Sequence, residues 1–172
     1  MADFDIAIKT VLSDEGGLVE NAQDPGGATK FGISLHFYQQ NIKKWADKYD
    51  IEDLTVDDAK AIYQKYFWTP NRYNMIASQK IATKVFDIAV NIGTTHANKC
   101  LQKATLASSD MIIEADGILG DRSFYVVNHC PEEQLYTAFK AEVASYYRNL
   151  VEQNPKLQVF LDGWLKRCYR DV

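Results

Sequence analysis

The chain has 172 residues, of which 47% are hydrophobic and 24% are charged, the balance of an ordinary soluble globular protein. This length suits one compact domain, or one domain with a small second lobe. The net charge of −4 argues against nucleic acid as a partner and does not favour attraction to any anionic polymer.

Three cysteines, Cys100, Cys130 and Cys168, lie far apart and form no CxxC motif. This argues against a disulfide scaffold and for synthesis in a reducing compartment. The histidines and cysteines show no zinc-ligand spacing, so we expect no metal site, and no motif indicates a cofactor. Residues 1–5 are acidic and lack a long apolar run, so we expect no signal peptide and synthesis in the cytoplasm.

The first element predicted is an amphipathic helix. Apolar residues recur at i, i+4, i+7 and i+8 over residues 4–12, which is the stripe of a core-facing helix. Gly16-Gly17 suits its C-terminal cap, which leaves Glu15 near the end of a rigid element. The segment 18–33 is rich in turn residues, above all Asp24-Pro25-Gly26-Gly27, and predicts a small, irregular β-hairpin.

Apolar periodicity and capping residues predict the remaining helices. Ser34 can cap the first of them, and Thr55 with Asp58 forms a variant of the capping box for the second. We predict helices over residues 35–48, 55–69, 80–91, 95–107, 123–128, 131–152 and around 159–165. The fold class is therefore mainly α with one small β element, and a seam near Gly93-Thr94 separates two halves.

Two carboxyl groups and a hydroxyl in the first half form a constellation suited to glycoside cleavage. That reaction needs a proton donor for the leaving oxygen and a carboxylate for the cationic centre or an attacking water. Glu15 suits the donor role, Asp24 the role of ionised carboxylate, and Thr29 can help to hold a water. Taken singly, each has a plainer explanation as a surface glutamate, a turn former or a strand threonine, so only the combination favours catalysis.

The same residues closely resemble a known family signature. Glu15-Gly16-Gly17, Asp24-Pro25-Gly26-Gly27 and the segment 29–34 resemble the signature of the glycoside hydrolase 108 family of N-acetylmuramidases. Segments 86–93, 116–120 and 160–167 resemble its central helix, its predicted peptidoglycan-binding region and its C-terminal helix. The resemblance covers nearly the whole chain.

The resemblance implies a lysozyme-like α+β fold, a helical bundle with a small β-hairpin next to the catalytic helix. It implies a catalytic muramidase region over residues 1–93 and a helical, peptidoglycan-binding region over 94–172 packed on it. Glu15 would be the catalytic glutamate. Phage-type lysozymes separate Asp and Thr by five residues, but only four separate Asp24 from Thr29, so we rank Glu15 first, Asp24 second and Thr29 third.

Three further residues are predicted to bind substrate. Phe31 and Tyr73 are candidate apolar walls for Glu15, and Tyr73 is also a candidate for stacking on sugar rings, although core packing explains such aromatics as well. Asn91 shares a helical face with Asp87, and the two residues either line a cleft or form buried hydrogen bonds. Phe31 stands where a tyrosine is common in the family, and Leu18 where an aromatic residue is.

We therefore expect a muramidase that cleaves the β-1,4 bond between N-acetylmuramic acid and N-acetylglucosamine. A lytic transglycosylase and a wall-binding module without turnover are the alternatives. The expected partner is the peptidoglycan glycan strand, with no nucleic acid and a monomeric enzyme. Without a signal peptide, the protein would reach the periplasm or cell wall through a holin or a secretion system.

Overall fold

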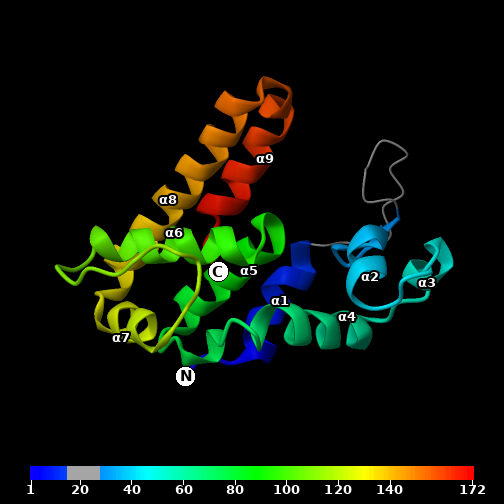
Figure 1. Cartoon of the computed structure of the whole chain (residues 1–172), viewed down its shortest axis with the longest axis horizontal. Coiled ribbons are helices and arrows are strands. Elements are labelled where there is room, and N and C mark those ends of the chain that lie inside the picture. The colour runs from blue at the N-terminus through cyan, green and yellow to red at the C-terminus, as the bar shows by residue number, and fades with distance from the viewer. Residues whose placement is uncertain (15–27) are drawn as a thin grey trace.

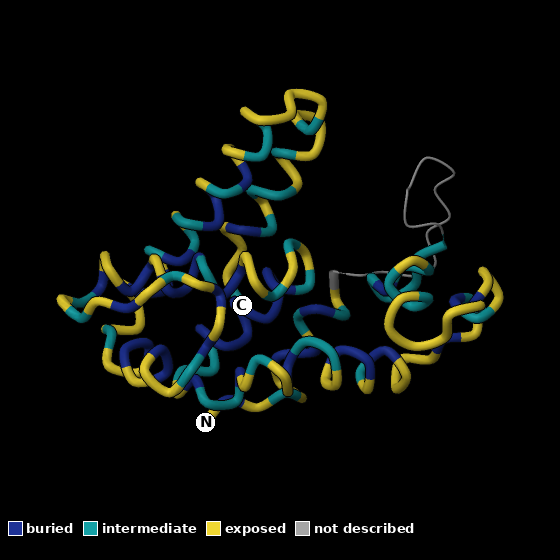
Figure 2. Tube along the Cα trace, viewed as in Figure 1, coloured by how far each residue is buried: buried dark blue, intermediate teal, exposed yellow. Residues whose placement is uncertain are grey.

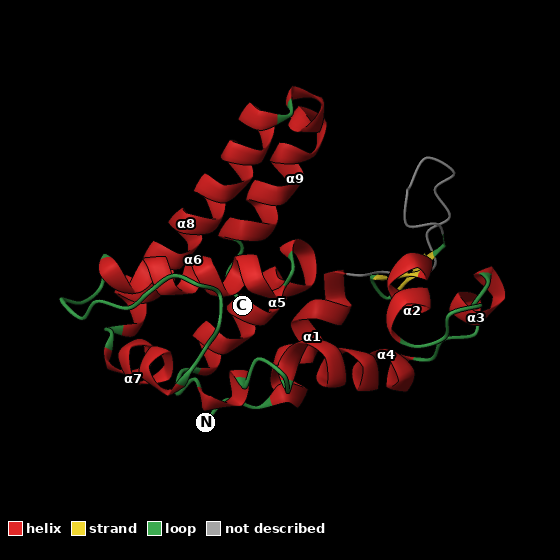
Figure 3. Ribbon diagram, viewed as in Figure 1, coloured by secondary structure: helices red, strands yellow, loops and turns green. Residues whose placement is uncertain are grey.

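The computed structural model describes residues 1–14 and 28–172, and it is mainly α, as predicted (Figure 1). One antiparallel sheet of two short strands lies beside α2 (Figure 3). The strands are β1 (Thr29–Lys30) and β2 (Ile33–Ser34). The α-helices are α1 (Phe4–Asp14), α2 (Leu35–Asn41), α3 (Lys48–Glu52), α4 (Val56–Tyr63), α5 (Gln79–Ile92), α6 (Thr94–Leu106), α7 (Asp121–His129), α8 (Glu132–Gln153) and α9 (Gln158–Tyr169).

Side-chain caps fix several helix starts, two of them at residues that the sequence predicts, Ser34 and Thr55. The Thr55 hydroxyl accepts from the amide of Asp58, whose carboxylate accepts from the amide of Thr55, a reciprocal capping box. The prediction of one helix over residues 35–48 is wrong. Helix α2 ends at Asn41, and Asp47 and Asp50 form a second capping box that starts α3 afresh.

The central element is α5, which is buried over residues 81–89 (Figure 2). Helices α1, α6 and α8 pack around it, and α8 packs against both α6 and α9. The α8–α9 hairpin projects from this body, and its far end is exposed (Figures 1 and 2). No helix in the described ranges is long and apolar enough to cross a membrane.

Aromatic side chains form much of the core between α1, α4 and α5. Short helices of other types, η1 (Gln64–Trp68), η2 (Tyr73–Met75) and η3 (Pro155–Leu157), link the α-helices. The π-helix η1 continues α4 and buries Trp68. The rings of Phe4 and Phe86 pack against Trp68, with centroids 5.6 and 5.4 Å away.

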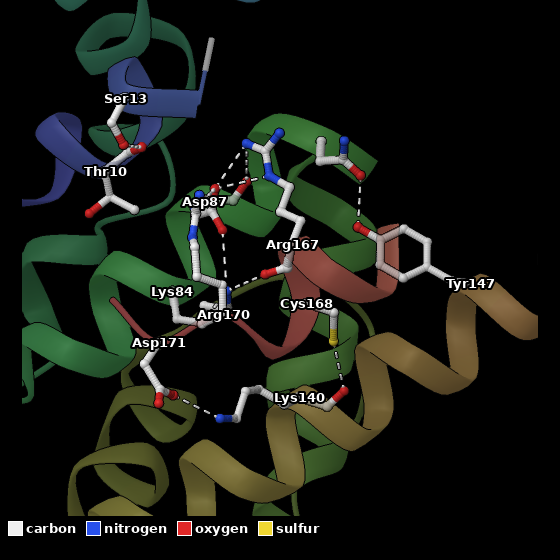
Figure 4. A network of polar contacts seen from close by, with 11 residues as sticks. Thr10, Ser13, Lys84, Asp87, Lys140, Tyr147, Arg167, Cys168, Arg170 and Asp171 are labelled. Atoms are coloured by element: carbon white, nitrogen blue, oxygen red, sulfur yellow. Dashed lines mark hydrogen bonds and ion pairs between the residues drawn. The ribbon is translucent and has the colours of Figure 1, made fainter. Parts of the chain in front are cut away.

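A buried ionic cluster joins α5 to the end of α9 (Figure 4). The side chains of Lys84 and Asp87 are fully buried and 3.4 Å apart. Lys84 Nζ also donates to the carbonyls of Arg167 and Arg170, over 2.7 and 2.9 Å, and Arg167 Nε donates to Asp87. A charge can be buried in a folded protein when it is paired and hydrogen-bonded. Because its partners come from α5 and from the end of α9, this cluster links the second half of the chain to the first.

The turn over residues 115–121 is held from α6 by two buried amides. Gln102 accepts from the amide of Gly117 and donates to Asp116, and Asn98 donates to the carbonyl of Gly117. Gly117 has a φ of 87°, and a Cβ there would lie 2.8 Å from Thr95. The turn therefore requires glycine at this position.

Candidate active site

Helices α1 and α5 begin side by side and run in the same direction (Figure 1). The amide of Asp3 donates to Gln79, which in turn donates to the carbonyl of Asp3. Because both helices rise equally per residue, their C-terminal ends lie at the same end of the bundle. Glu15 follows the last residue of α1 in the sequence; Glu15 and Asp24 both lie outside the described residues.

The hairpin that follows is closed by a two-residue turn with unusual backbone angles. Thr29 pairs with Ser34 and Lys30 with Ile33, which leaves Phe31-Gly32 as the turn. Phe31 and Gly32 have φ values of 53° and 76°, the positive values of a type I′ turn. Such turns favour Asn-Gly, and a phenylalanine at positive φ is strained, so neighbouring contacts must hold it there.

Two hydrogen bonds tie the hairpin to neighbouring helices. The hydroxyl of Tyr63, buried on α4, donates to the carbonyl of Phe31 over 2.7 Å. Lys30 Nζ donates to the carbonyl of Glu52 at the end of α3. The turn is thus fastened to α4 on one side and to α3 on the other, which fixes where Thr29 and Phe31 lie.

Thr29 carries a buried hydroxyl. Its Oγ1 is inaccessible to solvent and makes no hydrogen bond in the described structure. A buried polar group without a partner destabilises a fold by about 1–3 kcal/mol, so such groups are uncommon and often functional. Its position on an anchored hairpin fits the predicted role of holding a water.

Asn91 lies exposed on the last turn of α5, at the end where α1 also ends. Its Oδ1 accepts a hydrogen bond from the hydroxyl of Tyr147 on α8, over 2.7 Å (Figure 4). Burial raises the pKa of Tyr147, so the hydroxyl stays protonated and able to donate. Tyr147 therefore orients the side-chain amide of Asn91. The sequence did not indicate this role, because Tyr147 belongs to the apolar face of a long helix.

Tyr73 lies in the core, with 0% of its surface exposed, and its hydroxyl donates to Asn98. This position leaves no surface for a sugar ring to contact. Asp87 is also fully buried and paired with Lys84 and Arg167, so of the two roles considered for it, buried hydrogen bonding is the one observed. Of the residues predicted to bind substrate, Phe31 and Asn91 keep accessible surface.

The cysteines are free, with Cys100 and Cys168 buried and Cys130 partly buried. In residues 1–14 and 28–172, no three His, Cys, Asp or Glu side chains are grouped as metal ligands would be.

Comparisons with known proteins agree with this arrangement. The family model described as Glycosyl hydrolase 108 matches residues 8–93, half of the chain, and that described as Predicted Peptidoglycan domain matches residues 96–169. The chain is similar to the solved structure of Brucella abortus SagA, with a TM-score of 0.81 and 25% identity over 96% of this chain and 88% of that one. A comparison with curated protein sequences gave no match. The chain therefore belongs to the glycosyl hydrolase 108 family and is a peptidoglycan hydrolase of the lysozyme type.

Proposed function

We propose that the enzyme is an N-acetylmuramidase that hydrolyses the β-1,4 bond between N-acetylmuramic acid and N-acetylglucosamine. Glu15 is the general acid that protonates the leaving glycosidic oxygen. Asp24 is the second carboxylate, which aligns a water or stabilises the oxocarbenium-like centre. Thr29 positions that water, and Phe31 and Asn91 contact the sugars.

The observation that carries this proposal is the buried Thr29 hydroxyl, which has no hydrogen-bond partner among residues 1–14 and 28–172. It lies on a hairpin whose strained turn is held by Tyr63 and Lys30. A bound water or sugar would supply the missing hydrogen bond. The hairpin and the ends of α1 and α5 lie on the same side of α4 (Figure 1).

The two carboxyl groups need different protonation states. A carboxyl group in a partly apolar setting keeps its proton near neutral pH because burial raises its pKa, whereas one in a polar turn stays ionised. The separation of the carboxyl groups decides the stereochemical outcome: about 5–5.5 Å gives retention and about 6.5–9.5 Å gives inversion. Proton NMR of the first anomer released distinguishes the two outcomes.

The decisive experiment is the digestion of purified sacculi by wild type and by Glu15→Gln, with mass spectrometry of the products. We expect Glu15→Gln to fold normally and to lose lysis by at least about a hundredfold, within the range for loss of a general acid. Glu152→Gln, an exposed carboxyl change on α8, is the control and should keep full activity. Retained lysis in Glu15→Gln would refute the assignment.

The products also separate the alternative functions. Reducing N-acetylmuramic acid ends support hydrolysis, whereas anhydro-muramic ends would identify a lytic transglycosylase. Binding to sacculi without any released sugar would identify a wall-binding module. Sacculi with different peptide cross-links should be compared in the same assay, which measures the cross-link preference of the enzyme.

We also propose that the protein acts as a monomer in the periplasm or cell wall after release through a holin or a secretion system. Residues 94–172 would add affinity for the wall to the activity of residues 1–93. Sedimentation of the pure enzyme and fractionation of producing cells test these proposals separately from catalysis.

A further inference from the structure

Two aromatic side chains stand exposed, one just before α3 and one within it. Trp45 is 83% exposed and Tyr49 is 60% exposed. Tryptophan is mostly buried in folded proteins, since burying a large apolar side chain stabilises a fold by about 1.5–3 kcal/mol. Next to Trp45, Ala46 is buried and its carbonyl accepts from Gln39, so the segment is held in place with the ring outside.

Each aromatic ring has a lysine beside it. Lys44 Nζ lies 5.2 Å from the centre of the Trp45 ring, and Lys48 Nζ lies 5.0 Å from the centre of the Tyr49 ring. Within the described part of the chain, no ion pair engages Lys44 or Lys48. We call these four residues, Lys44, Trp45, Lys48 and Tyr49, the Trp45–Tyr49 face.

The acidic residues of the same segment are used elsewhere. Asp50 pairs with Lys43, and Asp47 caps α3. Asp50 and Asp53 line a groove between α2, α3 and α4, to which no residue of the Trp45–Tyr49 face contributes. The face thus carries two positive charges in a chain whose net charge is −4.

Helix α3 links this face to the hairpin of the candidate active site. Tyr49 belongs to α3, and the carbonyl of Glu52, at the end of α3, accepts the hydrogen bond from Lys30 of the hairpin. Lys30 lies next to Thr29 on the same strand. A polymer bound at the face would therefore be held against the lobe that carries the hairpin.

We propose that the Trp45–Tyr49 face is a docking surface for peptidoglycan strands, outside the catalytic site. Aromatic rings offer flat apolar faces to the C–H faces of pyranose sugars, and Tyr and Trp suit surfaces that are partly wet. The lysines would pair with the free carboxylates of the stem peptides, which compensates locally for the acidic chain. The inference rests on the proposed function, because it takes peptidoglycan as the ligand.

The test measures binding to purified sacculi in a Glu15→Gln background, so that turnover does not remove the ligand. Trp45→Ala and Tyr49→Ala should each weaken binding by about threefold to tenfold, and their combination by more. The control is Ile6→Ala, which truncates a side chain that is 52% exposed on α1, away from α3. Unchanged binding in the Trp45→Ala/Tyr49→Ala variant would overturn the proposal.

The contribution of the Lys44 and Lys48 charges is tested by the salt dependence of binding to sacculi. Lys44→Gln/Lys48→Gln should bind sacculi more weakly at low salt and show a smaller fall in binding as salt rises. Lys9→Gln/Lys65→Gln removes the same charge from two other exposed lysines and should keep the wild-type salt response. Equal effects of the two pairs would refute a local role for Lys44 and Lys48.

Substrates of different length distinguish the docking role proposed for the Trp45–Tyr49 face from the catalytic role proposed for Glu15. With Glu15 intact, Trp45→Ala/Tyr49→Ala should slow the lysis of sacculi and leave turnover of a short soluble glycan unchanged, whereas Glu15→Gln should abolish both. Vesicles of anionic lipid provide a further arm. Binding to vesicles that depends on Trp45, without any effect of Trp45→Ala on sacculi, would assign the face to membranes and contradict the proposal.

Discussion

The hydroxyl of Tyr63 holds the main-chain carbonyl of Phe31, a residue with a φ of 53° in the turn next to Thr29. We predict that Tyr63→Phe lowers the free energy of unfolding by about 1 kcal/mol, the net contribution of one hydrogen bond. It should also lower activity on sacculi, because the turn loses a contact that opposes its strain. Urea denaturation and lysis assays measure the two effects.

A second tyrosine provides the matched control. The hydroxyl of Tyr66 donates to the carbonyl of Asn41, away from the hairpin, so Tyr66→Phe should cost similar stability and keep activity. In a Phe31→Gly background, where the turn is unstrained, Tyr63→Phe should cost less activity than in wild type. Equal losses in both backgrounds would mean that Tyr63 does not act through the turn.

Two glycines should respond to alanine in opposite directions. At Gly117, with its φ of 87°, the new Cβ would meet the Thr95 backbone and side chain at 2.8 Å, so Gly117→Ala should destabilise the protein by more than about 1 kcal/mol. At Gly163, inside α9, the Cβ meets nothing within 4 Å, so Gly163→Ala should stabilise the protein by about 0.5–1 kcal/mol. Thermal melting of both variants checks the pair, and a shift of the same sign in both would contradict the prediction.

The buried ionic cluster should be sensitive to the loss of one partner. Asp87→Ala leaves Lys84 buried without its counter-charge, and we expect a loss of about 3–5 kcal/mol in the free energy of unfolding. Glu133→Ala breaks the Lys80–Glu133 pair at the surface and should cost at most about 1 kcal/mol. A urea titration of both variants measures the difference, and comparable losses would show that the cluster does not stabilise the fold as described.

Stability should fall in mild alkali. Burial raises the pKa of the Cys100 thiol from 9.0 to about 12. The folded state therefore keeps a proton that the unfolded state releases, and this stability is present below pH 9 and is lost as the pH rises towards 12. Between pH 9 and 10, Cys100→Ala should make the fall in the free energy of unfolding smaller by about 1 kcal/mol. Cys130→Ala, which removes a less buried thiol, should have a smaller effect on this fall. If the free energy of unfolding of Cys100→Ala fell with pH as steeply as that of wild type, the prediction would be contradicted.

Local signals in the sequence predicted much of the fold. The stripe of α5 and the capping box at Thr55 are set by residues within one or two helical turns, so pattern alone located both elements. The break after Asn41 was missed because the apolar pattern continues across it. The chain leaves the helix at Ile42, and α3 begins only at Lys48, where Asp47 and Asp50 form a capping box.

The site is less visible in the sequence because its contacts join distant segments. Tyr63 lies 32 residues from Phe31, and Tyr147 lies 56 residues from Asn91, so no motif spacing pairs them. Tyr73 was placed at the site on residue type alone, whereas the structure buries it against Asn98. Residue type indicates what a side chain can do, but burial decides whether a substrate can reach it.

Lys84 depends on two carbonyls that lie 83 and 86 residues further along the chain. Domains commonly fold in order of synthesis, the N-terminal part first. Until residues 167–170 have been made, the Lys84 ammonium group has Asp87 of its own helix as a partner but lacks the two carbonyls that complete its set of acceptors. We therefore expect the half that carries Glu15 to complete its core only when α9 packs onto it.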